Sequence, residues 1–282
     1  MLSIDGGGTR GALPALVLAE IERRAGKPTS ELFDLVAGTS IGGILALEMA
    51  TPDKDGSPKF NPAEAMARIF GELRLSDALT DVFIPSYELE GRNPFFFRSR
   101  VAREDPYEDF RMRDVAIATA SAPTYFEPAR LTRTDGTKES FVDGGVCLNN
   151  PAVAAYADTV EQLGHDPDLI LVSLGTGSLD RPLVYDEVRH WGLANWARPI
   201  LELAIDGVNH AVDWQMERLL SPHHYFRLSP HLRASHHIDD ASRRNLDELR
   251  GVAAEMIAER SEELDRICEL LLAPGEAPRE AI

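Results

Sequence analysis

The sequence predicts one α/β domain in which helices cover both faces of a β-sheet. Short apolar runs that end in glycine alternate with longer segments whose apolar residues recur at helical spacing. The chain has 282 residues, which is enough for one large α/β domain with a buried core. We assign residues 1–272 to this domain and expect residues 273–282 to form a disordered tail.

The first 50 residues contain a strand, a glycine turn and a helix twice over. Residues 2–5 are an apolar run that ends at three glycines, and residues 12–25 follow with a helical apolar pattern. Residues 35–38 are a second apolar run, and residues 41–50 a second apolar helix. Since glycine is costly inside regular structure, two glycine turns so close together suggest one active site built from both.

The same alternation continues through the middle of the chain. A polar loop over residues 51–61 precedes a helix over residues 62–73. The expected elements that follow are strands over residues 81–89 and 94–100, a helix from Met112 that Pro123 ends, a strand ending at Asp143, a helix over residues 152–163 and a strand over residues 168–177.

Beyond Arg181 the pattern predicts mainly helix. One apolar stripe runs through residues 245–272, and Asn245 with Glu248 forms a candidate N-terminal capping pair. The stripe indicates a helix that packs on the domain.

The run "NPFFFRSR" allows two interpretations, a membrane-touching patch or a buried strand. Phe95, Phe96 and Phe97 lie beside Arg98 and Arg100, which suits a lipid surface. Phenylalanine is nevertheless most often buried in folded proteins, and we favour the buried strand.

Composition excludes several classes of function. The formal net charge of −17 argues against nucleic acid as a partner and against charge-driven docking on anionic membranes. The two cysteines make no disulfide framework, and no Cys/His cluster has metal-ligand spacing. No apolar stretch is long enough to span a bilayer, and no signal-peptide pattern precedes the first strand. We therefore expect a cytoplasmic enzyme without a metal or other cofactor.

The glycine turn at residues 6–11 matches G-x-G-x-x-G through Gly6, Gly8 and Gly11. A dinucleotide site would need an acid at the end of the second strand, but that strand ends in "AGTS". A sugar-kinase-like phosphate turn would lead into another strand, whereas residues 12–25 are helical in pattern. What remains is a helix N-terminus whose N–H groups stabilise a phosphate or an oxyanion, reinforced by Arg10.

The second turn, Gly38-Thr39-Ser40-Ile41-Gly42, has the G-x-S-x-G pattern of a nucleophile elbow. A serine in such a strained turn requires residues without Cβ two positions before and two after it. Gly38 and Gly42 meet that requirement. The alternative is an ordinary glycine-rich loop. The flanking apolar strand and apolar helix favour a catalytic serine.

The base that would activate Ser40 is either a histidine or Asp143. Eight histidines are available for a Ser–His–Asp triad. The late ones lie in polar, loop-like sequence: His223, His224, His231, His236 and His237. Asp143 ends a predicted strand, and Gly144 and Gly145 allow its turn to approach another loop.

Together these residues resemble the patatin-like phospholipase family of lipid acyl hydrolases. "DGGGTRG" is similar to its oxyanion motif, "GTSIG" to its nucleophile elbow and "DGG" to its catalytic aspartate motif. "ATASAPTYFEPARL", "NNP", "SLGTGS" and "DDASRRNL" also resemble its bacterial members, and the motifs occur in the family's order. The segment between Ala50 and Leu75 is shorter than expected for those members.

The resemblance implies a three-layer α/β/α sandwich with a central, mostly parallel sheet and no metal cofactor. It implies that Ser40 is the nucleophile and Asp143 its base, in a dyad without histidine. The implied oxyanion turn comprises Gly6, Gly7, Gly8, Arg10 and Gly11, with the backbone N–H groups around Gly7 and Gly8 as donors. The implied substrate is a lipid or phospholipid ester, with transient contact to a membrane surface.

Three other functions remain open at this point. A general carboxylesterase would use the same residues on soluble esters. A nucleotide- or sugar-phosphate-binding kinase would use the glycine turn but leave Ser40 and Asp143 without a role. A catalytically inactive binding module is disfavoured by the intact dyad.

The dyad hypothesis predicts that replacing Asp143 abolishes most activity, whereas replacing any single histidine does not. Asp143→Asn should remove most of the turnover, because an amide cannot accept the serine proton. Single His→Ala changes should each leave activity within about tenfold of wild type, since a general base contributes about 10²–10⁴. Steady-state ester hydrolysis measures both, and an inactive but folded His→Ala variant beside an active Asp143→Asn variant would establish a triad instead.

Overall fold

A computed structural model describes the protein over residues 1–51, 66, 69–164, 169–179, 183–196, 199–232 and 237–273. The loop expected at residues 51–61, apart from Thr51, and half of the helix expected at 62–73 lie outside this part of the chain. So does the expected tail, apart from Ala273.

Parallel strands form the centre of the sheet. β1 (Leu2–Ile4) lies between β2 (Leu35–Gly38) and β7 (Leu171–Leu174), and Ile4 is opposite both Gly38 and Leu174. β9 (Tyr225–Leu228) extends the sheet beyond β7, again in parallel. All three residues of β1 are buried, as expected for a strand covered by helices on both faces.

The other half of the sheet contains antiparallel strands around β3 (Asp81–Glu88). β2 pairs in parallel with the first part of β3, with Ala37 opposite Phe83. β6 (Lys138–Asp143) pairs antiparallel with the last part of β3, with Asp143 opposite Ser86. β4 (Asn93–Arg98) pairs with residues 83–88 of β3 along its other edge, so β2 and β6 share one edge of β3. Their carboxyl ends point toward each other. β5 (Ala129–Thr132) pairs with β6, which gives the strand order β5-β6-β3-β2-β1-β7-β9.

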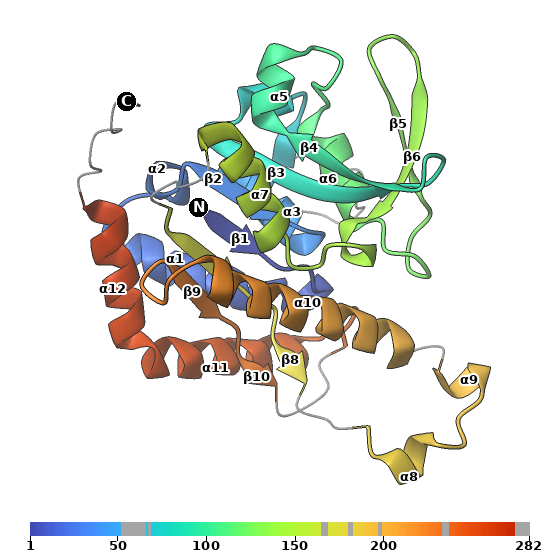
Figure 1. Ribbon diagram of the computed structural model, residues 1–282, viewed down its shortest axis with the longest axis vertical. Coiled ribbons are helices and arrows are strands. Elements are labelled where there is room, and N and C mark those ends of the chain that lie inside the picture. The colour runs from blue at the N-terminus through green and yellow to red at the C-terminus, as the bar shows by residue number, and fades with distance from the viewer. Residues whose placement is uncertain are drawn as a thin grey trace.

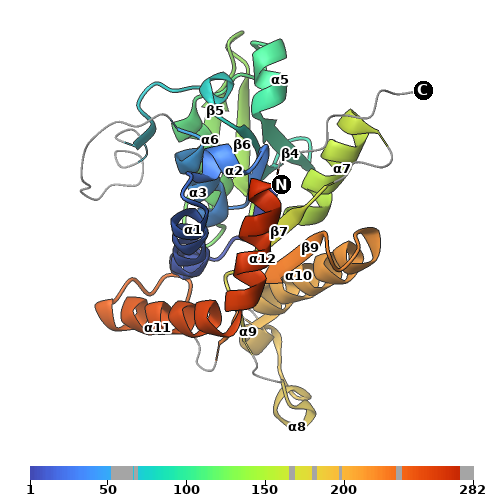
Figure 2. The ribbon, with the colours of Figure 1, turned by 90° about the vertical axis from the view of Figure 1, so that its left-hand side faces the viewer.

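Helices cover both faces of the sheet, which confirms the α/β/α sandwich (Figures 1 and 2). α1 (Ala12–Ala25), α3 (Ile41–Met49) and α6 (Met112–Ala120) lie on one face; α7 (Ala152–Leu163) and α10 (Pro199–Leu219) lie on the other. Other elements are α2 (Thr29–Leu32), α5 (Ser99–Glu104), α8 (Tyr185–Val188), α9 (Leu193–Trp196), β8 (Ser178–Leu179), β10 (His231–Leu232) and the 3₁₀ turns Gly8–Gly11, Leu75–Asp77 and Gly144–Val146. Within the described chain, no helix combines the length and apolar character needed to cross a bilayer.

The phenylalanine run belongs to strand β4, in which Phe97 is buried and Phe95 and Phe96 are half-buried. Phe97 is 1% exposed, and its ring lies 4.8 Å from Phe95 and 5.3 Å from Phe141 between centroids. Phe96 points to the opposite face, where it stacks on Phe83 at 4.9 Å. The alternation of a strand thus distributes the run over both faces of the sheet.

The C-terminal part differs from the expected single helix. α11 (Arg243–Glu259) and α12 (Ser261–Leu272) are separate helices that meet at Arg260 and run in different directions on the outside of α1 (Figure 1). The expected capping pair of Asn245 with Glu248 is also wrong. The Ser242 side chain caps α11 by accepting a hydrogen bond from the Asn245 N–H at 3.3 Å.

The region beyond Arg181 also contains strands, which the helical expectation missed. β9 joins the main sheet, and β10 pairs with β8. Four residues, "YFRL", suffice for β9 because β7 provides its pairing edge. Such a short apolar run gives no periodicity by which to tell strand from helix.

Candidate active site

Ser40 occupies a strained backbone conformation between β2 and α3. Its φ of 56° lies in a region of backbone conformation that residues other than glycine rarely adopt. A Cβ on Gly38 would lie 2.1 Å from the Gly42 carbonyl oxygen, and a Cβ on Gly42 would lie 2.4 Å from that of Ile4. The two glycines therefore allow the sharp turn and its close approach to β1.

The Ser40 side chain points toward Asp143. Its Oγ donates a hydrogen bond of 2.6 Å to Oδ2 of Asp143. The other carboxylate oxygen accepts the Gly145 N–H at 2.7 Å. The turn after Asp143 also needs glycine, because a Cβ on Gly144 would lie 2.4 Å from the Pro85 carbonyl oxygen.

Thr119 on α6 connects the serine turn to β3. Its Oγ1 accepts the Ser40 N–H at 3.0 Å and donates to the Pro85 carbonyl oxygen at 2.7 Å. This side chain fixes the backbone of the strained residue, and it is fully buried.

Burial makes Asp143 a stronger base than an ordinary carboxylate. Its side chain is 6% exposed, and desolvation raises its pKa to about 6, while the hydrogen bonds from Ser40 and Gly145 act in the opposite direction. The same burial raises the pKa of the neighbouring Cys147 thiol to about 11, so this thiol stays protonated at neutral pH.

The glycine turn after β1 lies beside the serine turn. A Cβ added to Gly6 would lie 3.3 Å from the Ser40 Cβ, and one added to Gly11 would lie 2.4 Å from Cγ1 of Ile41. Gly7 and Gly8 are equally confined, the first by Thr176 and the second by the Ile238 carbonyl oxygen. Four glycines thus let this turn fit between four different segments of the chain.

Hydrogen bonds fix the glycine turn at both ends. The Gly6 N–H donates to the Asn149 carbonyl oxygen at 3.0 Å, and Thr176 Oγ1 donates to the Gly6 carbonyl oxygen at 2.6 Å. On the far side, the Thr9 N–H donates to the Ile238 carbonyl oxygen at 2.8 Å and the Arg10 N–H to Gly7 at 3.1 Å. The N–H groups of Gly7 and Gly8 lie between these fixed points.

Arg10 steadies the same turn with its side chain. Its guanidinium donates to the Gly177 carbonyl oxygen at 3.4 Å. Its positive charge also favours the ionised form of Asp206 on α10, whose pKa burial nevertheless raises.

The structure thus brings together every site residue singled out in the sequence: the serine turn, the Asp-Gly-Gly turn and the glycine turn. Sequence reasoning assigned no role to Thr119, Asn149, Asp213 or Arg227, which hold these turns in place. The "NNP" motif was a signal for Asn149. Nothing in the sequence pattern singled out Asp213 or Arg227.

No histidine takes part in the described contacts of the site. The Asp143 carboxylate receives its hydrogen bonds from Ser40 and Gly145, and no histidine in the described ranges joins them. Among the residues that the structure describes, no three His, Cys, Asp or Glu side chains are grouped so that they could hold a metal ion.

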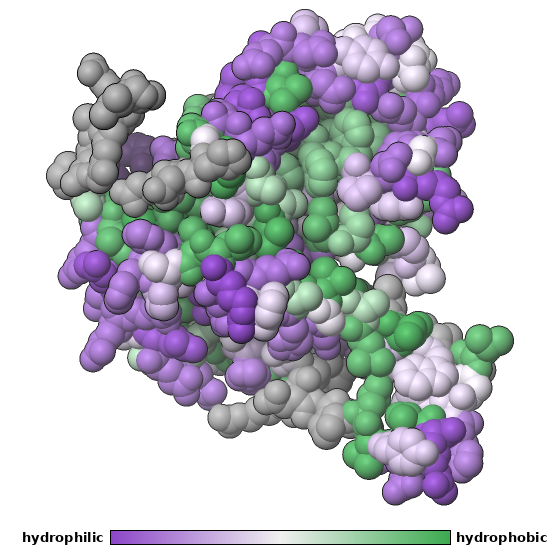
Figure 3. All heavy atoms as spheres, viewed as in Figure 1, coloured by the Kyte–Doolittle hydropathy of each residue, from purple (hydrophilic) through white to green (hydrophobic). Residues whose placement is uncertain are grey.

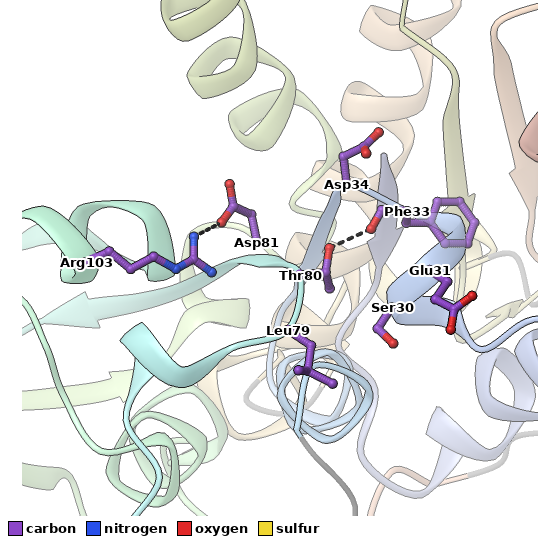
Figure 4. A pocket seen from close by; sticks show the side chains of 8 residues that line it. All are labelled: Ser30, Glu31, Phe33, Asp34, Leu79, Thr80, Asp81 and Arg103. Atoms are coloured by element: carbon purple, nitrogen blue, oxygen red, sulfur yellow. Dashed lines mark hydrogen bonds and ion pairs between the residues drawn. The ribbon is translucent and has the colours of Figure 1, made fainter. Parts of the chain in front are cut away.

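A cavity of about 400 Å³ lies elsewhere, at the amino-terminal ends of β2 and β3 (Figure 4). Three of its polar side chains have partners within the lining: Arg103 pairs with Asp81, and Thr80 donates to the Phe33 carbonyl oxygen. Because Ser40 follows the opposite end of β2, this cavity is not part of the candidate site.

Comparison with known proteins places this arrangement in a family. A family model described as "Patatin-like phospholipase" matches residues 2–61 and 57–156, which include both Ser40 and Asp143. The chain belongs to the patatin-like phospholipase family.

Plant patatin-like proteins are similar over most of the chain. Patatin-like protein 7 of Arabidopsis thaliana is 31% identical in an alignment that covers 93% of this chain and 66% of that protein. Patatin-like protein 2 of the same plant is 29% identical, with 97% and 83% covered. Among solved structures, VipD from Legionella pneumophila is 11% identical with a TM-score of 0.44, over 92% of this chain and 66% of that one.

The patatin-like glycine turn can be tested at Gly8, which has a φ of 55° and whose added Cβ would lie 2.2 Å from the Ile238 carbonyl oxygen. Gly8→Ala must displace the turn, so we expect kcat to fall more than tenfold, together with a lower Tm. Gly136→Ala is the control, because Gly136 also has a positive φ of 88° but open space around it. Wild-type kcat in folded Gly8→Ala would contradict this role for the turn.

The pKa of Asp143 predicts the acid limb of the pH profile. Because the base must be ionised, the rate of fluorophosphonate labelling of Ser40 should be level above pH 7 and fall about tenfold per pH unit below the pKa of about 6. Pseudo-first-order labelling between pH 4.5 and 9 measures this. An unchanged rate at pH 5 would show that no group with this raised pKa activates the serine.

Proposed function

We propose that this protein is a serine lipid acyl hydrolase that cleaves carboxylic esters of lipids or phospholipids. The observation that carries the proposal is the 2.6 Å hydrogen bond from Ser40, in its strained turn, to the buried carboxylate of Asp143. Membership of the patatin-like phospholipase family supports the same reaction class.

The reaction would proceed by acyl transfer in two steps. Asp143 accepts the Ser40 proton as Oγ attacks the ester carbonyl carbon, and the carbonyl oxygen becomes an oxyanion. The tetrahedral intermediate collapses to an acyl-enzyme as the protonated Asp143 returns its proton to the departing alkoxide. A water molecule, deprotonated in turn by Asp143, then attacks the acyl carbon. Asp143 returns this proton to Oγ of Ser40 as the bond between Oγ and the acyl carbon breaks and the fatty acid leaves.

The N–H groups of Gly7 and Gly8 would donate to the oxyanion. The turn that carries them is fixed by the hydrogen bonds of Gly6, Thr9 and Arg10 with their neighbours. Donors that are already oriented need no reorganisation during the reaction, and the loss of one such donor typically costs about 10²–10³ in rate.

Exposed apolar residues beside the dyad favour an apolar substrate. Val146, three residues after Asp143, is 49% exposed. Tyr125 and Phe126 are 46% and 56% exposed, in the turn just after Ser121, whose carbonyl oxygen accepts the Asp143 N–H at 3.0 Å. These side chains offer an apolar surface to an acyl chain, which a small soluble ester would not need.

The segment from α8 to the start of α10 would touch a lipid surface. It projects from the domain and carries exposed apolar residues (Figures 1 and 3). Tyr185, Leu193 and Ile200 are 73%, 94% and 54% exposed. α10 leads from this segment to the site, where Asn209 accepts a hydrogen bond from Asn149 at 3.1 Å. Aromatic and aliphatic residues together suit the interface of a bilayer.

Hydrolysis of phosphatidylcholine in vesicles, compared with a short-chain soluble ester, tests the proposal. Wild type should release fatty acid from vesicles, and Ser40→Ala should release none. Leu193→Asp should slow vesicle hydrolysis several-fold and leave soluble-ester hydrolysis unchanged, because only the former requires contact with a surface.

Leu163→Asp provides the matched control for that experiment. Leu163 is 65% exposed at the end of α7, and α7 is remote from α8 and α9 (Figure 2). Its replacement should change the rate of hydrolysis of neither substrate. Activity on soluble esters without any on vesicles would favour the general carboxylesterase. The absence of Ser40-dependent hydrolysis of both substrates would reject the hydrolase.

A further inference from the structure

A buried ion pair lies directly before the glycine turn. Asp5 is the last residue before Gly6, and it is 1% exposed. The guanidinium of Arg227 holds its carboxylate at two points: Nη1 lies 3.1 Å from Oδ1 and Nη2 lies 2.6 Å from Oδ2. Such a bidentate pair fixes the orientation of the carboxylate as well as neutralising it.

The sheet register explains how Arg227 reaches Asp5 from two strands away. Ser3 of β1, Ser173 of β7 and Arg227 of β9 lie side by side in the ladder. Asp5 follows Ser3 by two residues. The small Ser173 leaves room for the arginine side chain to cross β7, and its Oγ accepts a hydrogen bond from Nη1 at 2.9 Å.

A second carboxylate holds the other side of the guanidinium. Asp213 on α10 accepts from Nε of Arg227 at 3.2 Å, from the Tyr225 hydroxyl at 3.0 Å and from Nδ2 of Asn150 at 3.1 Å. Asn150 follows Asn149, whose carbonyl oxygen accepts the Gly6 N–H. The network therefore reaches the glycine turn by two routes, through Asp5 and through the two asparagines.

The pair resists any rotation of the peptide units that follow Asp5. A carboxylate as deeply buried as that of Asp5 must keep a partner, take up a proton or move toward water, because an unpaired buried charge costs several kcal/mol. Movement of Asp5 would carry with it Gly6 and the N–H groups of Gly7 and Gly8. No other bond described for the turn acts on Asp5 through its side chain.

We propose that Arg227 is a positioning residue for ester hydrolysis: through its bidentate contact with Asp5, it sets the direction of the N–H groups that stabilise the oxyanion. This inference rests on the proposed function of the same site. Arg227 touches neither Ser40 nor Asp143 in the described contacts, and it acts through the glycine turn alone.

Arg227→Lys separates positioning from charge neutralisation. Lysine keeps the positive charge but cannot hold both oxygens of Asp5 in a planar fork. We expect kcat, measured per serine labelled by fluorophosphonate, to fall about tenfold or more with KM within about twofold, since an oxyanion contact acts mainly in the transition state. The pH below which the labelling rate falls, which Asp143 sets, should be the same as in wild type.

Arg133→Lys is the matched control. Arg133 is also buried, with a side chain 4% exposed, and it also pairs with two carboxylates, Glu108 at 2.9 Å and Glu139 at 2.7 Å. It lies in the antiparallel part of the sheet near β5, so its replacement should lower Tm and leave kcat per labelled serine unchanged.

Asp5→Asn tests the same contact from the other side if Arg227→Lys does not fold. It keeps one acceptor oxygen and leaves Arg227 paired with Asp213, and it should lower kcat per labelled serine in the same way. Wild-type kcat in either folded variant, or an equal loss in Arg133→Lys, would overturn the positioning role. Absence of Ser40 labelling in wild type would instead reject the proposed function itself.

Discussion

Two strands that meet end to end on one edge of β3 create the candidate site. β2 runs parallel to β3 and ends at Gly38, while β6 runs antiparallel to it and ends at Asp143. The serine turn and the Asp-Gly-Gly turn must therefore share the space above Pro85, which accepts a hydrogen bond from Thr119. Both turns need glycine, because a Cβ added to Gly38 or Gly144 would collide with a backbone carbonyl oxygen. The hydrogen bond between Ser40 and Asp143 is a consequence of this arrangement.

The same crowding buries two carboxylates beside different partners. Asp143 has hydrogen-bond donors but no cation among its described contacts, and burial raises its pKa to about 6. Burial also raises the pKa of Asp5 to about 6, although its ion pair with Arg227 acts in the opposite direction. The raised pKa of Asp143 has an energetic cost. Relative to the ordinary aspartate pKa of 3.8, the contribution of Asp143 to stability is complete below about pH 4 and is lost as pH rises through about 6, a difference of about 3 kcal/mol. The greater basicity of this carboxylate is thus obtained at the expense of stability.

The chain beyond residue 156 completes the site from outside the segment that the family model matches. Thr176 and Ile238 hold the glycine turn, Arg227 holds the residue before it, and Asp213 holds Arg227. Parallel pairing of β9 with β7 brings Arg227 to Asp5, and α10 brings Asp213 to Arg227. The loop with Ile238 covers Gly8 and leaves no space for a side chain there. The last part of the chain therefore shapes a turn that lies near its beginning.

The sequence by itself determined the class of fold, the bounds of α1, β2 and α7, and the three glycine-containing turns. These features depend on local rules: helical periodicity, the space needed around Ser40, and the preference of glycine for strained backbone. Only the tertiary structure decided that β6 runs against β3, that β9 joins the sheet and that the C-terminal stripe divides at Arg260. The direction and pairing of a strand depend on partner strands far along the chain. A four-residue run such as that of β9 does not indicate which strand it will pair with. The same holds for Arg227, whose role depends on a carboxylate 222 positions away.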